Sequence, residues 1–270
     1  MILALLAKFM TDGGTNGRNG SDRKLISLTI LGTGDAFASG GRAQAGYLIE
    51  APGKRILLEA GPSVLTEMKR HGIAADSLDA VIISHLHGDH FGGLPFLFLE
   101  YMWERPRKHP VIIAGPRNLE QRTWILMRTM FSRFNLEKIQ KKIKWVVLEP
   151  KTTLKIAGMK VSTIRSPHTK PDVSLSLKLV LDGKTMVFSG DTGWNEHLVA
   201  FSEGADLMLC ECTYYESDHL RFHMNYPELK HHRARFNVGR MILTHIGRET
   251  MNHSSDIEIE MAFDGMKLDF

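Results

Sequence analysis

The stretch SHLHGDHFGGL, residues 84–94, holds three histidines and one aspartate within six positions: His85, His87, Asp89 and His90. An apolar run at 78–83 leads into it and predicts a buried strand. His85 and His87 are two residues apart just past that strand, so in an extended chain both imidazoles point the same way and can bind one ion. Asp89 and His90 follow where the chain turns into the next helix, and they can face a second ion. A carboxylate among imidazoles suits a borderline divalent metal, zinc above all.

The composition sets the class of protein. Of 270 residues, 43% are hydrophobic and 24% charged, as in a soluble globular protein. The net charge of +4 permits a small anionic substrate, but no dense Lys/Arg run favours nucleic acid. The two cysteines, Cys210 and Cys212, are too few for a disulfide framework and indicate a reducing compartment, the cytoplasm. No apolar stretch approaches the length of a membrane span, so no membrane partner is expected.

The pattern along the chain predicts one folded domain with a lead-in. Residues 1–24 end in a stretch rich in Gly, Asn and Asp and are expected to be flexible; the apolar residues 2–7 lack the flanks of a signal peptide. The domain is expected over 25–270. Strands are predicted at 25–31, 45–49, 55–59, 79–84, 111–114, 144–148, 160–164, 174–181, 185–189, 206–210 and 240–244. Helices are predicted at 63–71, 94–103, 119–134 and 226–236. Helices between strands in both halves predict an α/β protein with two sheets face to face and helices outside.

The pattern His85-x-His87-x-Asp89-His90 resembles the signature of the metallo-β-lactamase superfamily. The resemblance implies a four-layer αββα sandwich (α/β, of the α+β kind) with a one- or two-metal site at the edge of the two sheets. It covers about residues 25–246 and implies further ligands in a fixed order. RSPHT supplies His168, FSGDTGW supplies Asp191 and MILTHIG supplies His245.

The family pattern also implies how these ligands are divided. His85, His87 and His168 would bind the first metal. Asp89, His90 and His245 would bind the second, and Asp191 would bridge the two. A histidine at position 87, where the di-iron, oxygen-reducing branch has glutamate, favours hydrolysis.

Two divalent ions that share a carboxylate define a chemistry. They lower the pKa of a bridging water toward neutrality and neutralise charge on the transition state. We therefore expect a hydrolase with two divalent ions per chain and a metal-bridging hydroxide, with zinc first and manganese or iron as alternatives. Such a site acts on phosphodiesters, carboxylic esters, lactones, lactams or sulfate esters, and the metals alone do not choose among them.

Other segments resemble the ribonuclease Z-like branch of the superfamily. Residues 28–50 resemble its opening, a strand, a Gly-Thr-Gly loop and a second strand. DLMLCECTYYE resembles its strand ending in His-Glu-Ala-Thr: Glu211 and Thr213 match, whereas Cys210 and Cys212 do not and are expected to pack in the core. In that branch the glutamate pairs with a histidine that protonates the leaving oxygen, and the matching candidate is His223. The candidate catalytic residues are Asp89, Glu211 and His223.

The role of His223 and the substrate stay open. A carboxylate that orients an imidazole makes a sensible general acid; the alternative is that His223 caps the helix at Tyr226. Bacterial tRNA-processing members carry a tRNA-gripping arm between the motif histidine that matches His168 and the Gly-Asp-Thr aspartate. Here His168 and Asp191 are 23 residues apart, enough only for two strands and a turn. A small phosphodiester or nucleotide is therefore expected rather than long RNA. A same-fold hydrolase of carboxylic, lactone or sulfate esters and a metal-binding module without turnover are the alternatives.

Two further expectations concern the surroundings of the site. The usual Asp-x-Gly after the third strand reads Glu59-Ala60-Gly61, which predicts a different contact behind the metals. The helical stretch 94–134 is expected to set specificity. Most of its apolar side chains are expected to pack in the core, and the rest to form an apolar wall or a homodimer face. Its arginines are expected to form a solvated face.

Overall fold

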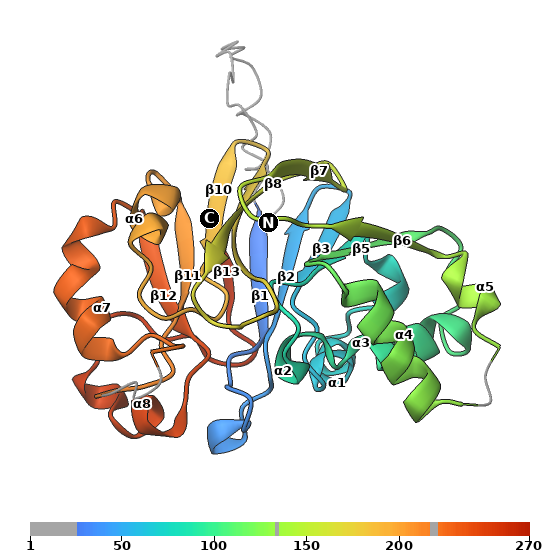
Figure 1. Ribbon diagram of the computed structural model, residues 1–270, viewed down its shortest axis with the longest axis horizontal. Helices are drawn as coiled ribbons and strands as arrows, with labels where there is room; N and C mark the ends of the chain where they lie inside the picture. The colour runs from blue at the N-terminus through green and yellow to red at the C-terminus, as the bar shows by residue number, and fades with distance from the viewer. Residues whose placement is uncertain (1–25, 133–134, 217–220) are drawn as a thin grey trace, which may run out of the picture.

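The computed structural model describes residues 26–132, 135–216 and 221–270. The predicted lead-in, 1–24, and Leu25 lie outside the described residues. Within the described part, two mixed β-sheets form the centre of the molecule (Figure 1). One sheet has seven strands in the order β13-β1-β2-β3-β4-β5-β6, and the other has six in the order β12-β11-β10-β9-β8-β7.

The first sheet combines antiparallel and parallel pairs. β13, β1, β2 and β3 pair antiparallel, and β3, β4, β5 and β6 pair parallel. Its strands are β1 (Ser27–Gly32), β2 (Gly46–Ala51), β3 (Lys54–Leu58), β4 (Ala80–Ile82), β5 (Val111–Gly115), β6 (Ile143–Val147) and β13 (Lys267–Asp269).

The second sheet has the same mixed character. β7, β8, β9 and β10 pair antiparallel, and β10, β11 and β12 pair parallel. Its strands are β7 (Thr153–Ile156), β8 (Met159–Ser166), β9 (Ser174–Leu181), β10 (Lys184–Phe188), β11 (Leu207–Glu211) and β12 (Arg240–Thr244).

Helices cover the outer face of each sheet, and Figure 1 shows the two groups on opposite sides of the molecule. The group on the first sheet contains α1 (Val64–Arg70), α2 (Gly88–Phe91), α3 (Leu94–Met102), α4 (Leu119–Met130) and α5 (Glu137–Gln140). The group on the second sheet contains α6 (Glu196–Ser202), α7 (Tyr226–His232) and α8 (Arg248–Asn252). The predicted αββα sandwich is confirmed: this is the metallo-β-lactamase fold.

Side-chain alternation explains why four layers form. On β2, Tyr47 and Ile49 belong to the central core between the sheets, while Leu48 belongs to the core under the outer helices. Phe188 comes from the other sheet to the same central core, with its ring centroid 5.3 Å from that of Tyr47. A strand that is apolar on both faces needs cover on both, which is why each sheet lies between the other sheet and a layer of helices.

Several expected elements differ from the observed ones. The helix predicted at 119–134 ends at Met130, and the one at 226–236 is α7 followed by a 3-10 turn at Arg233–Arg235. Strand β7 and helix α6 were not predicted, β7 because it is an edge strand whose first three side chains are exposed. The interval between His168 and Asp191 is filled by β9, β10 and a two-residue turn, Asp182-Gly183, as predicted. Among the described residues no helix has both the length and the apolar character needed to cross a bilayer.

Candidate metal centre

The motif at 85–90 lies directly after β4, at the end of the first sheet. β4 is buried on both faces, and the chain leaves it in extended conformation through His87 (φ −79°, ψ 149°) before α2 begins at Gly88. The rings of His85 and His87 therefore lie together, with centroids 4.8 Å apart. Asp89 and His90 lie on α2 and are buried.

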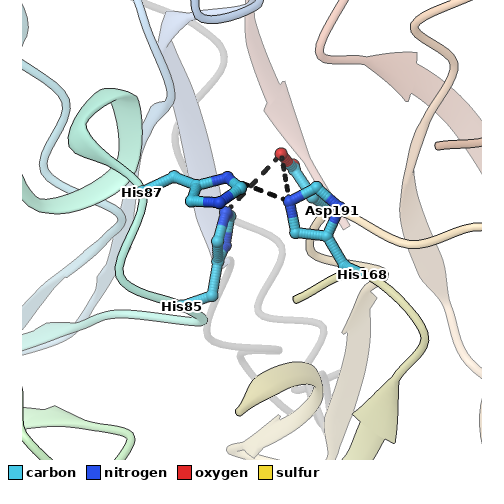
Figure 2. A group of neighbouring side chains, drawn as sticks. All are labelled: His85, His87, His168 and Asp191. Carbon is cyan, nitrogen blue, oxygen red and sulfur yellow. Dashed lines mark hydrogen bonds and ion pairs between the residues drawn. The ribbon is translucent and has the colours of Figure 1, made fainter. Parts of the chain in front are cut away.

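Two groups of candidate ligands meet at this end of the sandwich. In the first, the ligand atoms of His85, His87, His168 and Asp191 all lie within 4.8 Å of one another, and Figure 2 shows the four side chains converging. Nε2 of His168 is 3.0 Å from Nδ1 of His87, and Nε2 of His85 is 3.6 Å from Oδ2 of Asp191. His168 and Asp191 come from loops that follow β8 and β10 of the second sheet, so the group bridges the two sheets.

The second group shares a residue with the first. It consists of Asp89, His90, His245 and again Asp191. Oδ2 of Asp191 lies 3.2 Å from Nε2 of both His90 and His245, and Oδ2 of Asp89 lies 3.2 Å from Nε2 of His245. The structure thus brings together all seven predicted ligands, and Asp191 is the residue common to both groups.

The donor atoms in the two groups fit metal ions. Within the part of the chain that the structure describes, Nε2 of His85, Nε2 of His90 and Oδ1 of Asp191 are buried without a hydrogen-bond partner. A buried polar atom left unsatisfied costs about 1–3 kcal/mol, so three at one place require an explanation. Divalent cations between the two groups would bind these atoms and account for their convergence. Imidazole and carboxylate donors are those preferred by zinc and neighbouring divalent metals.

The protonation states also suit metal binding. Burial lowers the pKa of His85, His87 and His168, so their imidazoles are neutral and have lone pairs to offer. Although burial alone would raise it, His245, His90 and His85 hold the pKa of Asp191 well below the usual range for a carboxyl group. The first group therefore combines neutral imidazoles with an ionised shared carboxylate, as metal ligation requires. In the second group burial would lower the pKa of His90 and His245, but the carboxylates of Asp191 and Asp89 raise it.

Contacts behind the ligands fix the ring orientations. Nδ1 of His90 donates to Oε2 of Glu59 (3.1 Å), and Nδ1 of His168 donates to the carbonyl oxygen of Phe222 (2.7 Å). Nδ1 of His85 is 3.0 Å from Oγ of Ser84. In each case Nε2 is left to point into the centre.

Glu59 stands where the usual Asp-x-Gly motif has aspartate, and its side chain makes the contact behind the metal ligands that was expected to differ. Its fully buried side chain binds His90 and accepts the backbone N–H of Ser84 (2.8 Å). Its backbone is left-handed (φ 62°), which is uncommon for a residue with a side chain. Glu59 therefore links the end of β3 to the metal-binding loop after β4.

Glu211 and His223 form the predicted pair beside the centre. Glu211 ends β11 and is buried, and its Oε1 lies 3.0 Å from Nδ1 of His223. The His223 ring lies nearly parallel to that of His245, with centroids 5.3 Å apart. The capping alternative is wrong, because the side chain of Asn225 caps α7 by accepting the N–H of Glu228 (3.0 Å).

Thr213 has a role that the sequence did not reveal. Its hydroxyl donates to Oε2 of Glu211 (2.8 Å) and also lies 2.8 Å from Nδ1 of His245. Thr213 matched the branch motif, but only the structure shows that it joins a candidate ligand to the candidate acid pair. Cys210 and Cys212 are buried in the core under the outer helices, as predicted.

Comparison with known proteins assigns the chain to a family. Residues 26–263 match the family model described as Anti-Pycsar protein Apyc1. The chain belongs to this family. By sequence it is 23% identical over 246 residues to a probable metallo-hydrolase, YhfI, from Bacillus subtilis (strain 168), a match that covers 89% of this chain and 95% of the relative.

Solved structures of the same fold cover almost the whole chain. The human short-form tRNase Z superimposes with a TM-score of 0.72 and 22% identity, covering 90% of this chain and 98% of that one. A diphosphatase from the PhnP family superimposes with a TM-score of 0.73 and 16% identity, covering 91% and 98%. These likenesses show that the chain has the metallo-β-lactamase fold. Its own His/Asp groups could hold metal ions.

Proposed function

We propose that this protein is a dinuclear metal-dependent phosphodiesterase that hydrolyses small phosphodiesters, nucleotides among them. The observation that carries the proposal is the shared carboxylate: two four-residue ligand groups meet at Asp191, and the Glu211–His223 pair lies directly beside them. A single structural metal would need only one closed set of ligands.

Each group has the residues to hold one ion. His85, His87 and His168 would hold the first; Asp89, His90 and His245 would hold the second; Asp191 would contact both. We propose zinc, with manganese or iron as alternatives. Divalent ions at such a centre lower the pKa of water toward neutrality and neutralise charge on phosphoryl oxygens.

The chain itself supplies the proton for the leaving group. Glu211 accepts a hydrogen bond from Nδ1 of His223, which fixes the imidazole over the ligand groups. The ring also lies 4.7 Å, between centroids, from that of His168, so it faces both candidate metal positions. We assign His223 as the general acid that protonates the leaving oxygen, and Glu211 as the residue that orients it.

Two observations support a phosphodiester over a carboxylic, lactone or sulfate ester. A poor alkoxide leaving group, as in a nucleotide, requires a proton donor, and the Glu211–His223 pair provides one. Two of the similar proteins are called a tRNase Z and a diphosphatase, and both names refer to phosphate chemistry. The short β9–β10 turn supports a small substrate rather than long RNA.

A substrate panel tests the proposal. We would compare bis(p-nitrophenyl) phosphate, a lactone, an aryl sulfate and a β-lactam, each with zinc and with manganese. The phosphodiester should be hydrolysed fastest, and Asp191→Asn should abolish that activity. Turnover of the lactone or the sulfate without the phosphodiester would favour the alternative hydrolase. No turnover at full metal loading would favour a binding module.

A further inference from the structure

A pocket of about 500 Å³ opens beside the candidate metal centre, between the β1–β2 loop and α8. Its lining includes Phe37, Thr213, Tyr214 and Arg248. Thr213 belongs to both sites, since its hydroxyl contacts His245, and the ring of Tyr214 lies 6.0 Å from that of His223, between centroids. A volume of this size is typical of small-molecule sites. A substrate with its phosphate at the ligand groups could therefore extend into this pocket.

The loop that forms one wall is firmly held. The buried carboxylate of Asp35 accepts the N–H groups of Phe37 (3.2 Å) and Ser39 (3.0 Å) and the hydroxyl of Ser39 (2.9 Å). At the base of the loop, Asp264 accepts the N–H groups of Thr33 (2.9 Å) and Ala43 (2.7 Å). These contacts define the loop shape without any help from the side chain of Phe37.

The tip of the loop also packs on the opposite wall. A Cβ on Gly40 would lie 2.2 Å from Sδ of Met251 on α8, and Gly40 has a left-handed backbone (φ 67°). The close approach fixes the distance between the loop and α8, so the pocket is preformed. Figure 1 shows the β1–β2 loop projecting past the ends of the sheets on the side where α2 and α8 lie.

Phe37 is exposed although its loop is ordered. Its side chain is 86% exposed, compared with 58% for Phe263 and 48% for Phe222. Because the phenyl ring stays in water after folding, it adds no hydrophobic stabilisation to the fold. The ring does offer an aromatic face at the mouth of a pocket that leads to the metal centre.

Arg248 brings hydrogen-bond donors to the same pocket. It is exposed, at the start of α8, and its side chain makes no hydrogen bond or ion pair with another described residue. The carboxylates of the lining are occupied elsewhere, Asp35 with its own loop and Glu249 with the N–H of Tyr215 (3.0 Å). The guanidinium of Arg248 is therefore available to a ligand.

We propose that this pocket receives a nucleobase of the substrate, stacked on Phe37 and hydrogen-bonded by Arg248, while the phosphate lies at the metal centre. The inference rests on the phosphodiesterase function proposed above and adds its specificity residues. Aromatic side chains stack on any base through its π-face, and the donors of arginine match the acceptor atoms on base edges. Phe37 and Arg248 thus favour base-bearing phosphates over phosphates that carry only a sugar or an alkyl group.

Binding measurements separate the base from the rest of the ligand. We would compare adenosine 5′-monophosphate with ribose 5-phosphate by calorimetry on the metal-loaded protein, because the two share sugar and phosphate and differ in the base. The wild type should bind the nucleotide more tightly. Phe37→Ala should weaken nucleotide binding about tenfold, as expected for the loss of one stacked base, and leave ribose 5-phosphate unchanged.

Matched variants complete the test. Phe37→Trp should retain the preference, and Arg248→Ala should reduce it. Phe263→Ala, which removes another exposed ring that does not line the pocket, should leave both dissociation constants unchanged. Equal effects of Phe37→Ala on both ligands, or none, overturn the proposal. A changed association state in sedimentation with an unchanged preference also overturns it, because Phe37 then contacts a second copy of the chain.

The binding test can fail separately from the test of the proposed function. Binding is measured without turnover, whereas hydrolysis of bis(p-nitrophenyl) phosphate by the wild type reports the phosphodiesterase activity. A protein that hydrolyses the diester but shows no base preference retains the proposed function and loses the base pocket. A protein that prefers the nucleotide but does not hydrolyse the diester retains the base pocket and loses the proposed function.

Discussion

Asp191 occupies the most demanding position in the centre, because one carboxylate serves two groups of ligands. It is 2% exposed and has one oxygen without a hydrogen-bond partner among the described residues. Burying such a group is costly unless a cation pairs with it. The surrounding histidines hold the pKa of Asp191 low even without ions, so the carboxylate is ready to bind.

Asp191→Asn should lose metal from both positions. The amide keeps the size of the side chain but removes the negative charge and one strong acceptor. Metal content per chain, measured by plasma mass spectrometry after purification without chelator, should fall from up to two ions to well below one. Asp206→Asn is the matched control, since Asp206 binds Lys184 and the N–H of Thr185 instead. Full metal content in Asp191→Asn would contradict the bridging role.

His223→Ala should act selectively on poor leaving groups. A nitrophenolate leaves without a proton, so its release should slow little. A ribose alkoxide needs the proton, so that reaction should slow about a hundred- to ten-thousand-fold. Rate constants on both substrates at matched metal loading give the comparison. Equal losses on both would show that His223 binds substrate or supports its loop instead.

Glu211→Gln tests the orienting role separately. The amide can still accept the N–H of Thr192, which Oε1 of Glu211 now accepts at 2.5 Å, so the turn beside Asp191 should persist. It loses the charge that stabilises a protonated His223. The variant should therefore resemble His223→Ala on both substrates but with smaller losses.

At the residue scale, the sequence predicts ligands better than their surroundings. His85, His87 and Asp191 stand in short motifs directly after strands, which made them recognisable. Phe37 lies 48 positions before His85 in a glycine-rich loop, and nothing local relates it to a site. Its relevance comes from the packing of the loop on α8, a contact between distant segments that no short motif encodes.

Strands were predictable from the sequence where most of their consecutive side chains are buried. β4 is apolar at every position, and β9 and β12 have the predicted bounds. β7 has one buried side chain in four and, among the described strands, pairs only with β8, so its pattern resembles a loop. The predicted specificity region, 94–134, contributes Trp124 and Met127 to the core. The described residues of this region do not line the pocket beside the metal centre.

The β9–β10 hairpin should limit the substrate. We expect its two-residue turn to be too short to contact an RNA elbow. The protein should therefore hydrolyse small phosphodiesters far faster than it removes a trailer from pre-tRNA, as measured by initial rates at equal enzyme concentration. Efficient, site-selective removal of the trailer would show that another element binds the RNA.

The cap of α7 should stabilise the segment after His223. Asn225 accepts the N–H of Glu228, and replacing such a residue by alanine costs about 1 kcal/mol. Asn225→Ala should lower the free energy of unfolding by that amount in urea titrations, and Asn225→Ser, which can still cap, should lower it less. Equal stability of Asn225→Ala and wild type would contradict the capping role.

At the scale of the whole molecule, metal binding should stabilise the fold. Ions that bind the native state but not the unfolded chain add about 2.7 kcal/mol at a concentration of 100 times the dissociation constant. Removal of metal with EDTA should lower the melting temperature in scanning calorimetry, and added zinc should restore it. The same treatment should hardly change Asp191→Asn. A melting temperature unaffected by EDTA, at confirmed metal loss, would contradict the coupling.

The division of ligands between the two sheets has a consequence for how the protein matures. Four candidate ligands precede position 91, whereas His168, Asp191 and His245 follow in the second sheet. A chain emerging from the ribosome therefore cannot complete the centre until its late strand β12 has been made and paired. β1 likewise gains its second neighbour only when β13 arrives. The ions would thus enter after synthesis rather than during it, and their supply in the cell would govern a final step of assembly.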